Sequence, residues 1–115
     1  MATSGLHGPY NLTIQDIDAV VRGKGAGAYA LGNSSGDTFT ISYVGRSDED
    51  LNARLKNWIG NYPKFKYGFL DSPMAAFEKE CNLFHDFGET NLDNKIHPAR
   101  PNGTGWKCPR CRIFD

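Results

Sequence analysis

The sequence has no excess of charge of either sign, since 13 Lys and Arg residues balance 13 Asp and Glu residues. A neutral chain has no long-range field that attracts a polyanion, so any nucleic-acid contact must depend on a local patch. The chain also lacks an apolar run near the roughly 20 residues that span a bilayer. Residues 1–10 lack the basic and apolar regions of a signal peptide. We therefore expect a cytoplasmic protein with no membrane partner.

Cysteine is scarce, with only Cys81, Cys108 and Cys111 in the chain. An odd number, with two residues in a Cys-x-x-Cys pair, is a poor basis for a secreted disulfide framework. Reduced thiols, bound to a metal ion, fit this pattern better. Internal repeats and low-complexity tracts are absent as well, so a single domain is the simplest organisation.

Apolar residues make up 39% of the chain and include seven Phe, five Tyr and two Trp. This is enough to fill one compact core in 115 residues. We expect one domain over residues 1–115, with a core at about 24–96, an N-terminal helix at about 13–22 and a Cys-containing tail at 97–115.

The patterning predicts an α+β fold, with helices that flank a small, mainly antiparallel, three-stranded sheet. Apolar residues recur at helical spacing in three segments, and they alternate with polar residues in others. The expected order is a helix at about 13–22, a hairpin with strands at 28–31 and 38–44, a helix capped by Ser47 and ended by Gly60, a strand within 65–70, and a helix from Ser72 to Phe87.

Two charged residues lie where helical spacing would place core residues. Glu80 follows Phe77 by three residues and precedes Phe84 by four, and Arg54 follows Leu51 by three. A carboxylate can hold a hard divalent cation, and a guanidinium can bind phosphate oxygens in its planar fork. The pair suggests a shared polar site, whereas a generic helix would more often pair such a Glu with Lys or leave it at the edge of the stripe.

Gly27-Ala28-Tyr29, followed after thirteen residues by Tyr43-Val44-Gly45, resembles the paired elements that name the GIY-YIG nucleases. That family includes excision-repair nucleases, homing endonucleases and some restriction enzymes. It places the two elements on adjacent strands, follows them with a helix that carries an arginine, and later places a glutamate on another helix. The segments 52–55 and 76–84 are similar to these helices, which assigns the arginine to Arg54 and selects Glu80 over Glu78.

The resemblance covers about residues 27–94 and has two departures. Ala28 stands where the family commonly has a larger aliphatic residue. One extra residue separates Gly45 from Arg54 relative to many members, so Arg46 is an alternative for the arginine role.

The resemblance implies a metal-dependent endonuclease that hydrolyses phosphodiester bonds of nucleic acid, with DNA favoured over RNA. Glu80 would hold Mg²⁺ or Mn²⁺, Tyr29 would help to deprotonate the attacking water, and Arg54 would stabilise charge on the phosphoryl group. Tyr43 would line the same pocket. The alternatives are a non-catalytic nucleic-acid-binding or protein-interaction module on the same fold, and a small zinc-stabilised domain; the tyrosines would then be ordinary strand aromatics.

A group of basic residues lies between the second Tyr-bearing element and the third strand, with Trp58 and Tyr62 interleaved. Such a mixture can hold backbone phosphates and stack a base, although it more often forms a solvated face. The candidate nucleic-acid-binding residues are Arg46, Lys56, Lys64 and Lys66.

Cys108 and Cys111 form a Cys-x-x-Cys pair, which is typical of structural zinc sites. The tetrahedral shell of such a site needs four N or S ligands, so this pair can supply two of them. Cys81 and His85 are one helical turn apart, so both can face one ion. His97 can replace either of these two. Without zinc, Cys81 would be a small core residue and the tail pair would be free thiols.

Overall fold

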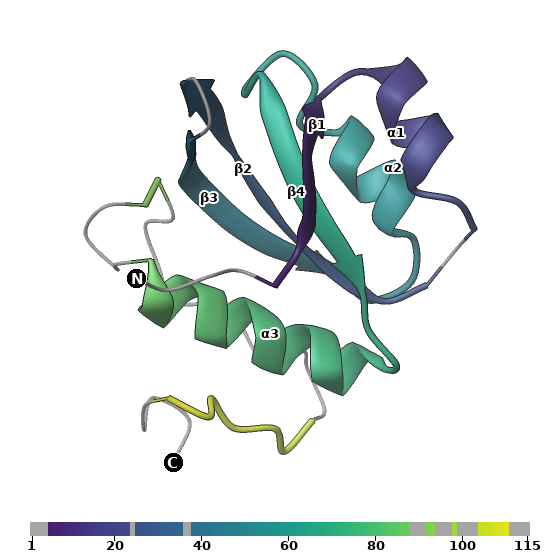
Figure 1. Ribbon diagram of the computed structural model, residues 1–115. Helices are drawn as coiled ribbons and strands as arrows, with labels where there is room; N and C mark the ends of the chain where they lie inside the picture. The colour runs from purple at the N-terminus through teal and green to yellow at the C-terminus, as the bar shows by residue number, and fades with distance from the viewer. Residues whose placement is uncertain are drawn as a thin grey trace.

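The computed structural model describes residues 5–23, 25–35, 38–87, 92–93, 98 and 104–110. These residues form an α+β fold, in which a four-stranded antiparallel sheet with strand order β1-β4-β2-β3 packs against three helices (Figure 1). The elements are β1 (His7–Asn11), α1 (Ile14–Val20), β2 (Gly27–Ser35), β3 (Thr38–Ser47), α2 (Leu51–Lys56), β4 (Lys64–Phe69) and α3 (Pro73–Asp86).

The two faces of the sheet are covered by different helices, as Figure 1 shows. Side chains alternate along β2, so Tyr29 and Leu31 contact one apolar cluster while Ala28 and Ala30 contact the other. The first cluster is completed by buried residues of α1, α2 and β4, among them Ile17, Leu51, Leu55 and Phe65. The second is completed by Val44 of β3 and by Leu83 and Phe84 of α3.

Edge strand β3 therefore has α2 near one face and α3 near the other. It pairs with β2 in antiparallel register, with Tyr29 opposite Gly45 and Ala28 opposite Arg46. Residues near the end of β3 can thus meet side chains from both helices. This edge is where the candidate site lies.

Side-chain caps explain where the helices begin. The hydroxyls of Thr13 and Ser72 accept hydrogen bonds from backbone N–H groups in the first turns of α1 and α3, and Pro73 occupies the first position of α3. The predicted helices at both places are confirmed. The cap of α2 is Asp50 and not Ser47 as predicted: Ser47 ends β3, and its hydroxyl accepts a hydrogen bond from Asp50 N–H.

The prediction of a three-stranded sheet was wrong, because residues 7–11 form an additional edge strand that pairs with β4. This segment contains Gly8 and Pro9 and shows no alternation of apolar and polar residues. Pro lacks the N–H that an inner strand needs, but an edge strand tolerates it. The β1–β4 register is irregular between His7 and Tyr10.

The tail segment 104–110 lies along the side of α3 that faces away from the sheet (Figure 1). Trp106 and Cys108 pack there with Phe77 and Cys81 of α3 in a third, smaller apolar cluster.

In the described part of the chain, no helix is both long and apolar enough to cross a membrane.

Candidate functional site

Gly45 makes room for the ring of Tyr29. The two residues are direct partners in the β2–β3 register, and a Cβ added to Gly45 would lie 2.9 Å from a ring carbon of Tyr29 and closer still to its hydroxyl. Real Cβ atoms essentially never make such contacts. The glycine after Tyr43-Val44 therefore lets the Tyr29 ring lie across the neighbouring strand.

The hydroxyl of Tyr29 is buried and hydrogen-bonded. Only 1% of the residue is exposed, and its oxygen accepts a hydrogen bond of 2.9 Å from Nε1 of Trp58. Burial raises the pKa of Tyr29, while the hydrogen bond from Trp58 and the interaction with Arg54 lower it. Because the net shift is upward, the phenol is protonated at neutral pH.

Glu80 is buried on the inner side of α3, with 8% of the residue exposed. Its Oε1 accepts a hydrogen bond of 2.6 Å from Nη1 of Arg46, which reaches across from β3. Burial raises the pKa of Glu80; the charges of Arg46 and Arg54 lower it, and Asp48 raises it further. The net shift is upward, so burial outweighs both arginines.

The second carboxylate oxygen of Glu80 is available to a ligand. Among the described residues, Arg46 is the only group that donates a hydrogen bond to Glu80, and it does so to Oε1 alone. Mg²⁺ in proteins is often bound through one or two carboxylates, several waters and substrate phosphates. A single carboxylate with one open oxygen fits this donor set.

Arg46 serves the structure as well as the site. Its Nε lies 3.2 Å from Oδ1 of Asp48, and its guanidinium lies 5.3 Å from the centre of the Phe77 ring. The side chain is 14% exposed. A guanidinium fixed by two carboxylates and an aromatic ring holds Glu80 in one orientation.

Arg54, by contrast, is exposed on α2 and has no ion pair within the described part of the chain. Its charge nevertheless lowers the pKa of Tyr29, of Tyr43 and of Glu80. It lines an open hollow together with Ser47, Asp48, Glu49, Asp50, Ala53 and Asn57.

Tyr43 connects this group to an aromatic cluster. Its ring centre lies 4.5 Å from that of Trp58 and 6.4 Å from that of Tyr62. Burial raises the pKa of Tyr43, and so does the negative charge of Glu80, whereas Arg54 lowers it. Tyr43 therefore lies within electrostatic reach of both charged residues.

The structure thus brings together the four residues that the sequence selected, Tyr29, Tyr43, Arg54 and Glu80, from β2, β3, α2 and α3. Sequence reasoning missed two partners of this group. Trp58 was predicted only as a possible stacking ring, yet its indole N–H donates a hydrogen bond to the Tyr29 hydroxyl. Asp48, the second partner of Arg46, carries no signal of its own, since it lies in a run of acidic residues, Asp48-Glu49-Asp50.

The four basic candidates are not gathered into one patch. Arg46 lies at the site, and Lys56 forms an ion pair of 2.7 Å with Asp18 between α2 and α1. Lys64 donates a hydrogen bond to Asn11 at the far end of β4, and Lys66 lies over the ring of Phe39 on the α3 face of the sheet.

Three of the candidate zinc ligands lie in the described part of the chain, and Cys111 and His97 lie outside it. Nε2 of His85 is 3.4 Å from Sγ of Cys108, and Cys81 belongs to the same buried cluster as Cys108. Within the residues described, no three His, Cys, Asp or Glu side chains converge so that they could hold an ion.

Searches of protein-family models, curated proteins and solved structures found no match to this chain.

Proposed function

We propose that this protein is a metal-dependent endonuclease of the GIY-YIG type that hydrolyses phosphodiester bonds in nucleic acid. The observation that carries the proposal is the convergence of a buried glutamate, an exposed arginine and two tyrosines from four separate elements at one edge of the sheet. A carboxylate on a stripe that should be apolar is costly for folding alone, since a buried charge requires a partner.

The chain's own residues have distinct tasks in this proposal. Oε2 of Glu80 would bind Mg²⁺ or Mn²⁺, and the ion would supply Lewis-acid polarisation of the scissile phosphate. Arg54 can meet the phosphate oxygens, because the residue is exposed and makes no ion pair among the described residues, although it also interacts with the Tyr29 side chain. Arg46 is the positioning residue that fixes Glu80.

The tyrosines handle the proton of the attacking water. The water oxygen bonds to phosphorus, the bond from phosphorus to the leaving oxygen breaks, and the water proton passes to the Tyr29 phenolate, while solvent protonates the leaving oxygen. Because the pKa of Tyr29 is raised, the phenolate is a minor form at neutral pH. The positive charge of Arg54 lowers that pKa and so stabilises the phenolate. Tyr43 supplies a second hydroxyl that orients the water.

The direct test is cleavage of labelled single-stranded, duplex and branched DNA and RNA with Mg²⁺, with Mn²⁺ and with EDTA. We expect cleavage with either ion, loss of cleavage in EDTA, and its return when excess Mg²⁺ is added. Binding of a substrate without cleavage under all metal conditions would favour the non-catalytic binding module, in which Glu80 serves only to pair with Arg46. If no substrate is bound or cut, both the endonuclease hypothesis and the hypothesis of a non-catalytic nucleic-acid-binding module are wrong.

We also propose a structural zinc ion at the junction of α3 and the tail, held by Cys81, His85, Cys108 and Cys111, with His97 as the alternative ligand. The separation of His85 Nε2 and Cys108 Sγ supports this proposal. A tetrahedral zinc ion, at about 2.0 Å from nitrogen and about 2.3 Å from sulfur, places its ligand atoms about 3.5 Å apart. The observed 3.4 Å is close to that value.

Protein purified without a metal-affinity tag is expected to contain about one zinc per chain by elemental analysis. Cys108→Ser should lose the metal, because a hydroxyl is a far poorer zinc ligand than a thiolate. His7→Asn is the matched control, since His7 packs against Tyr67 on the sheet, away from α3, and should keep the metal. A folded wild-type protein without zinc would contradict the proposal.

A further inference from the structure

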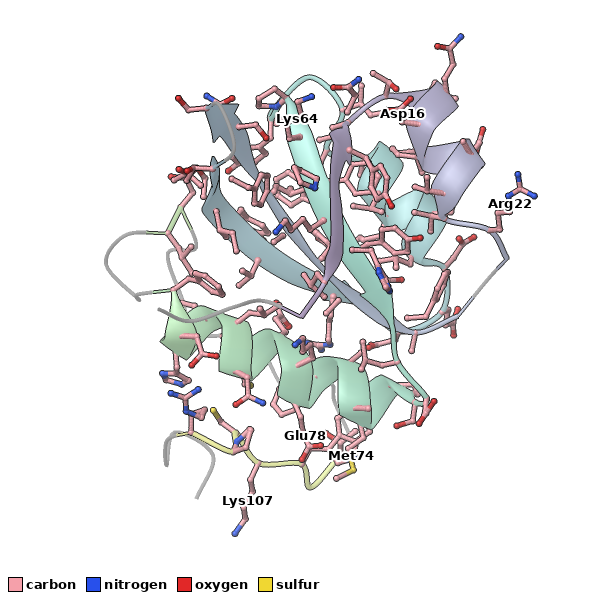
Figure 2. All side chains as sticks on the ribbon, in the orientation of Figure 1. Asp16, Arg22, Lys64, Met74, Glu78 and Lys107 are labelled. Carbon is pink, nitrogen blue, oxygen red and sulfur yellow. The ribbon has the colours of Figure 1, made fainter. Side chains whose placement is uncertain are left out.

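An open hollow lies at the end of the molecule where β4 begins, beside the turn that joins α2 to β4. It has a volume of about 500 Å³ and is lined by Asn11, Leu12, Thr13, Gly60, Asn61, Tyr62 and Pro63. Figure 2 shows the position of Lys64 at this end of the molecule, and Asp16 of α1 lies at the same end. The residues that line it therefore include an aromatic residue, a proline and two asparagines.

Tyr62 connects this hollow to the candidate active site. Its ring is a member of the cluster with Tyr43 and Trp58, and its centre is 6.1 Å from that of Trp58 and 6.4 Å from that of Tyr43. The Tyr62 hydroxyl donates a hydrogen bond of 2.7 Å to Oδ2 of Asp93, which fixes the ring. A half-buried ring held in one orientation loses little entropy when a second flat group stacks on it.

We propose that this hollow binds an unpaired nucleobase of the substrate strand, an inference that rests on the proposed nuclease function. Every base has a π-face that can stack on tyrosine, and the Asn11 and Asn61 amides can bond to a base edge. A base inside a duplex has both faces stacked and its edge paired, so it cannot use these groups. The substrate is therefore single-stranded, flapped or otherwise locally unpaired nucleic acid.

The charges around the hollow favour a base inside it and a phosphate at its rim. Asp93 accepts the hydrogen bond of Tyr62, and Asp16 accepts one of 3.2 Å from Asn11 N–H, so two carboxylates would repel a phosphate within the hollow. Lys64 lies next to it, where its ammonium group donates to Oδ1 of Asn11. A backbone phosphate can bind this ammonium while its base occupies the hollow.

The test is equilibrium binding in EDTA, which prevents cleavage, with short labelled single-stranded DNA, single-stranded RNA and blunt duplex DNA. Tyr62→Leu removes the π-face and is expected to weaken single-strand binding by about tenfold while duplex binding changes less than about twofold. Tyr62→Phe, the matched control, keeps the π-face and loses only the hydrogen bond to Asp93, so its single-strand affinity should stay near that of the wild type. The two single-stranded probes show whether the base comes from DNA or RNA.

Asn61→Asp provides a second test that does not depend on the packing of Tyr62, because Asn61 is exposed. A third carboxylate at the hollow should weaken single-strand binding more than duplex binding. Wild-type single-strand affinity in both Tyr62→Leu and Asn61→Asp, with metal-dependent cleavage intact, would overturn the nucleobase site and leave the nuclease proposal standing. Absence of both binding and cleavage in the wild type would remove both.

Discussion

Glu80→Gln is expected to reduce the single-turnover cleavage rate by about a thousandfold while the protein stays folded. Glutamine has nearly the same volume as glutamate and keeps an oxygen that can accept the hydrogen bond from Arg46. It lacks the negative charge that binds a divalent cation. The measurement is cleavage of the preferred substrate at saturating Mg²⁺, with circular dichroism and urea unfolding on the same preparation.

Glu78→Gln is the matched control, because Glu78 lies on the same helix but on the side that faces away from the sheet (Figure 2). The same chemical change there removes one charge and should leave the cleavage rate unchanged. Equal cleavage by the wild type and Glu80→Gln would remove Glu80 from the mechanism. Equal loss in both variants would show that the helix needs its net charge and that the position of Glu80 is irrelevant.

The stability of Glu80→Gln provides an independent readout. Burial raises the pKa of Glu80 above its ordinary value of 4.5, so the folded state binds the proton more tightly than the unfolded state does. The wild type therefore loses part of its free energy of unfolding as pH rises through the folded pKa of Glu80. Glutamine cannot titrate, so this loss should be absent, and the stability of the variant relative to the wild type should increase as pH rises from below 4.5.

The sequence was sufficient for the helices whose ends are encoded locally. Ser72 and Pro73 define the start of α3. Phe77 and Phe84 are both buried as their spacing predicts, but Phe84 packs on the sheet and Phe77 packs in the cluster with the tail. Strand β1 could not be found in the same way, because its segment lacks alternation and its partner β4 lies more than 50 residues later in the chain, with Asn11 opposite Lys64. Non-local pairing of this kind leaves no periodic signal in the strand itself.

The candidate site shows the same division between local and non-local information. The motif and the charged residues on apolar stripes were enough to select Tyr29, Tyr43, Arg54 and Glu80. The pairing of Arg46 with Glu80 depends on how α3 crosses the sheet. A partial signal did exist, since strand alternation places Arg46 on the same face as Val44, which is the α3 face, and Tyr43 on the opposite one.

The distribution of the lysines could not be predicted, because their sequence positions say nothing about their partners. Lys56 forms an ion pair with Asp18 because α1 packs on α2. Lys64 donates a hydrogen bond to Asn11 because β1 pairs with β4. Both partners come from the N-terminal segment, which lies outside the part of the chain that the family resemblance covers. The basic residues that are grouped in the sequence therefore make separate contacts and do not form one patch in the structure.

Replacement of Arg54 by alanine and replacement of Arg46 by alanine are expected to have different effects, the first on the cleavage rate and the second on the stability of the fold. Arg54→Ala should lower the cleavage rate by about a hundredfold and leave stability nearly unchanged, because the side chain is exposed and makes no ion pair in the described residues. Arg46→Ala should destabilise the fold by about 3 kcal/mol, because it leaves the buried carboxylate of Glu80 without its donor. Urea unfolding and single-turnover cleavage, applied to both variants, measure the two effects.

Arg46→Ala and Glu80→Gln combined in one chain separate the structural role of Arg46 from a catalytic one. Once glutamine replaces the glutamate, no buried charge remains to be compensated at that position, so the cost of Arg46→Ala should fall well below its value in the wild-type background. If the cost is the same in both backgrounds, Arg46 stabilises the fold through Asp48 and Phe77 and does not act through Glu80. If Arg54→Ala cleaves like the wild type while a folded Arg46→Ala protein does not, the arginine that contacts phosphate is Arg46, and Glu80 must release it when substrate binds.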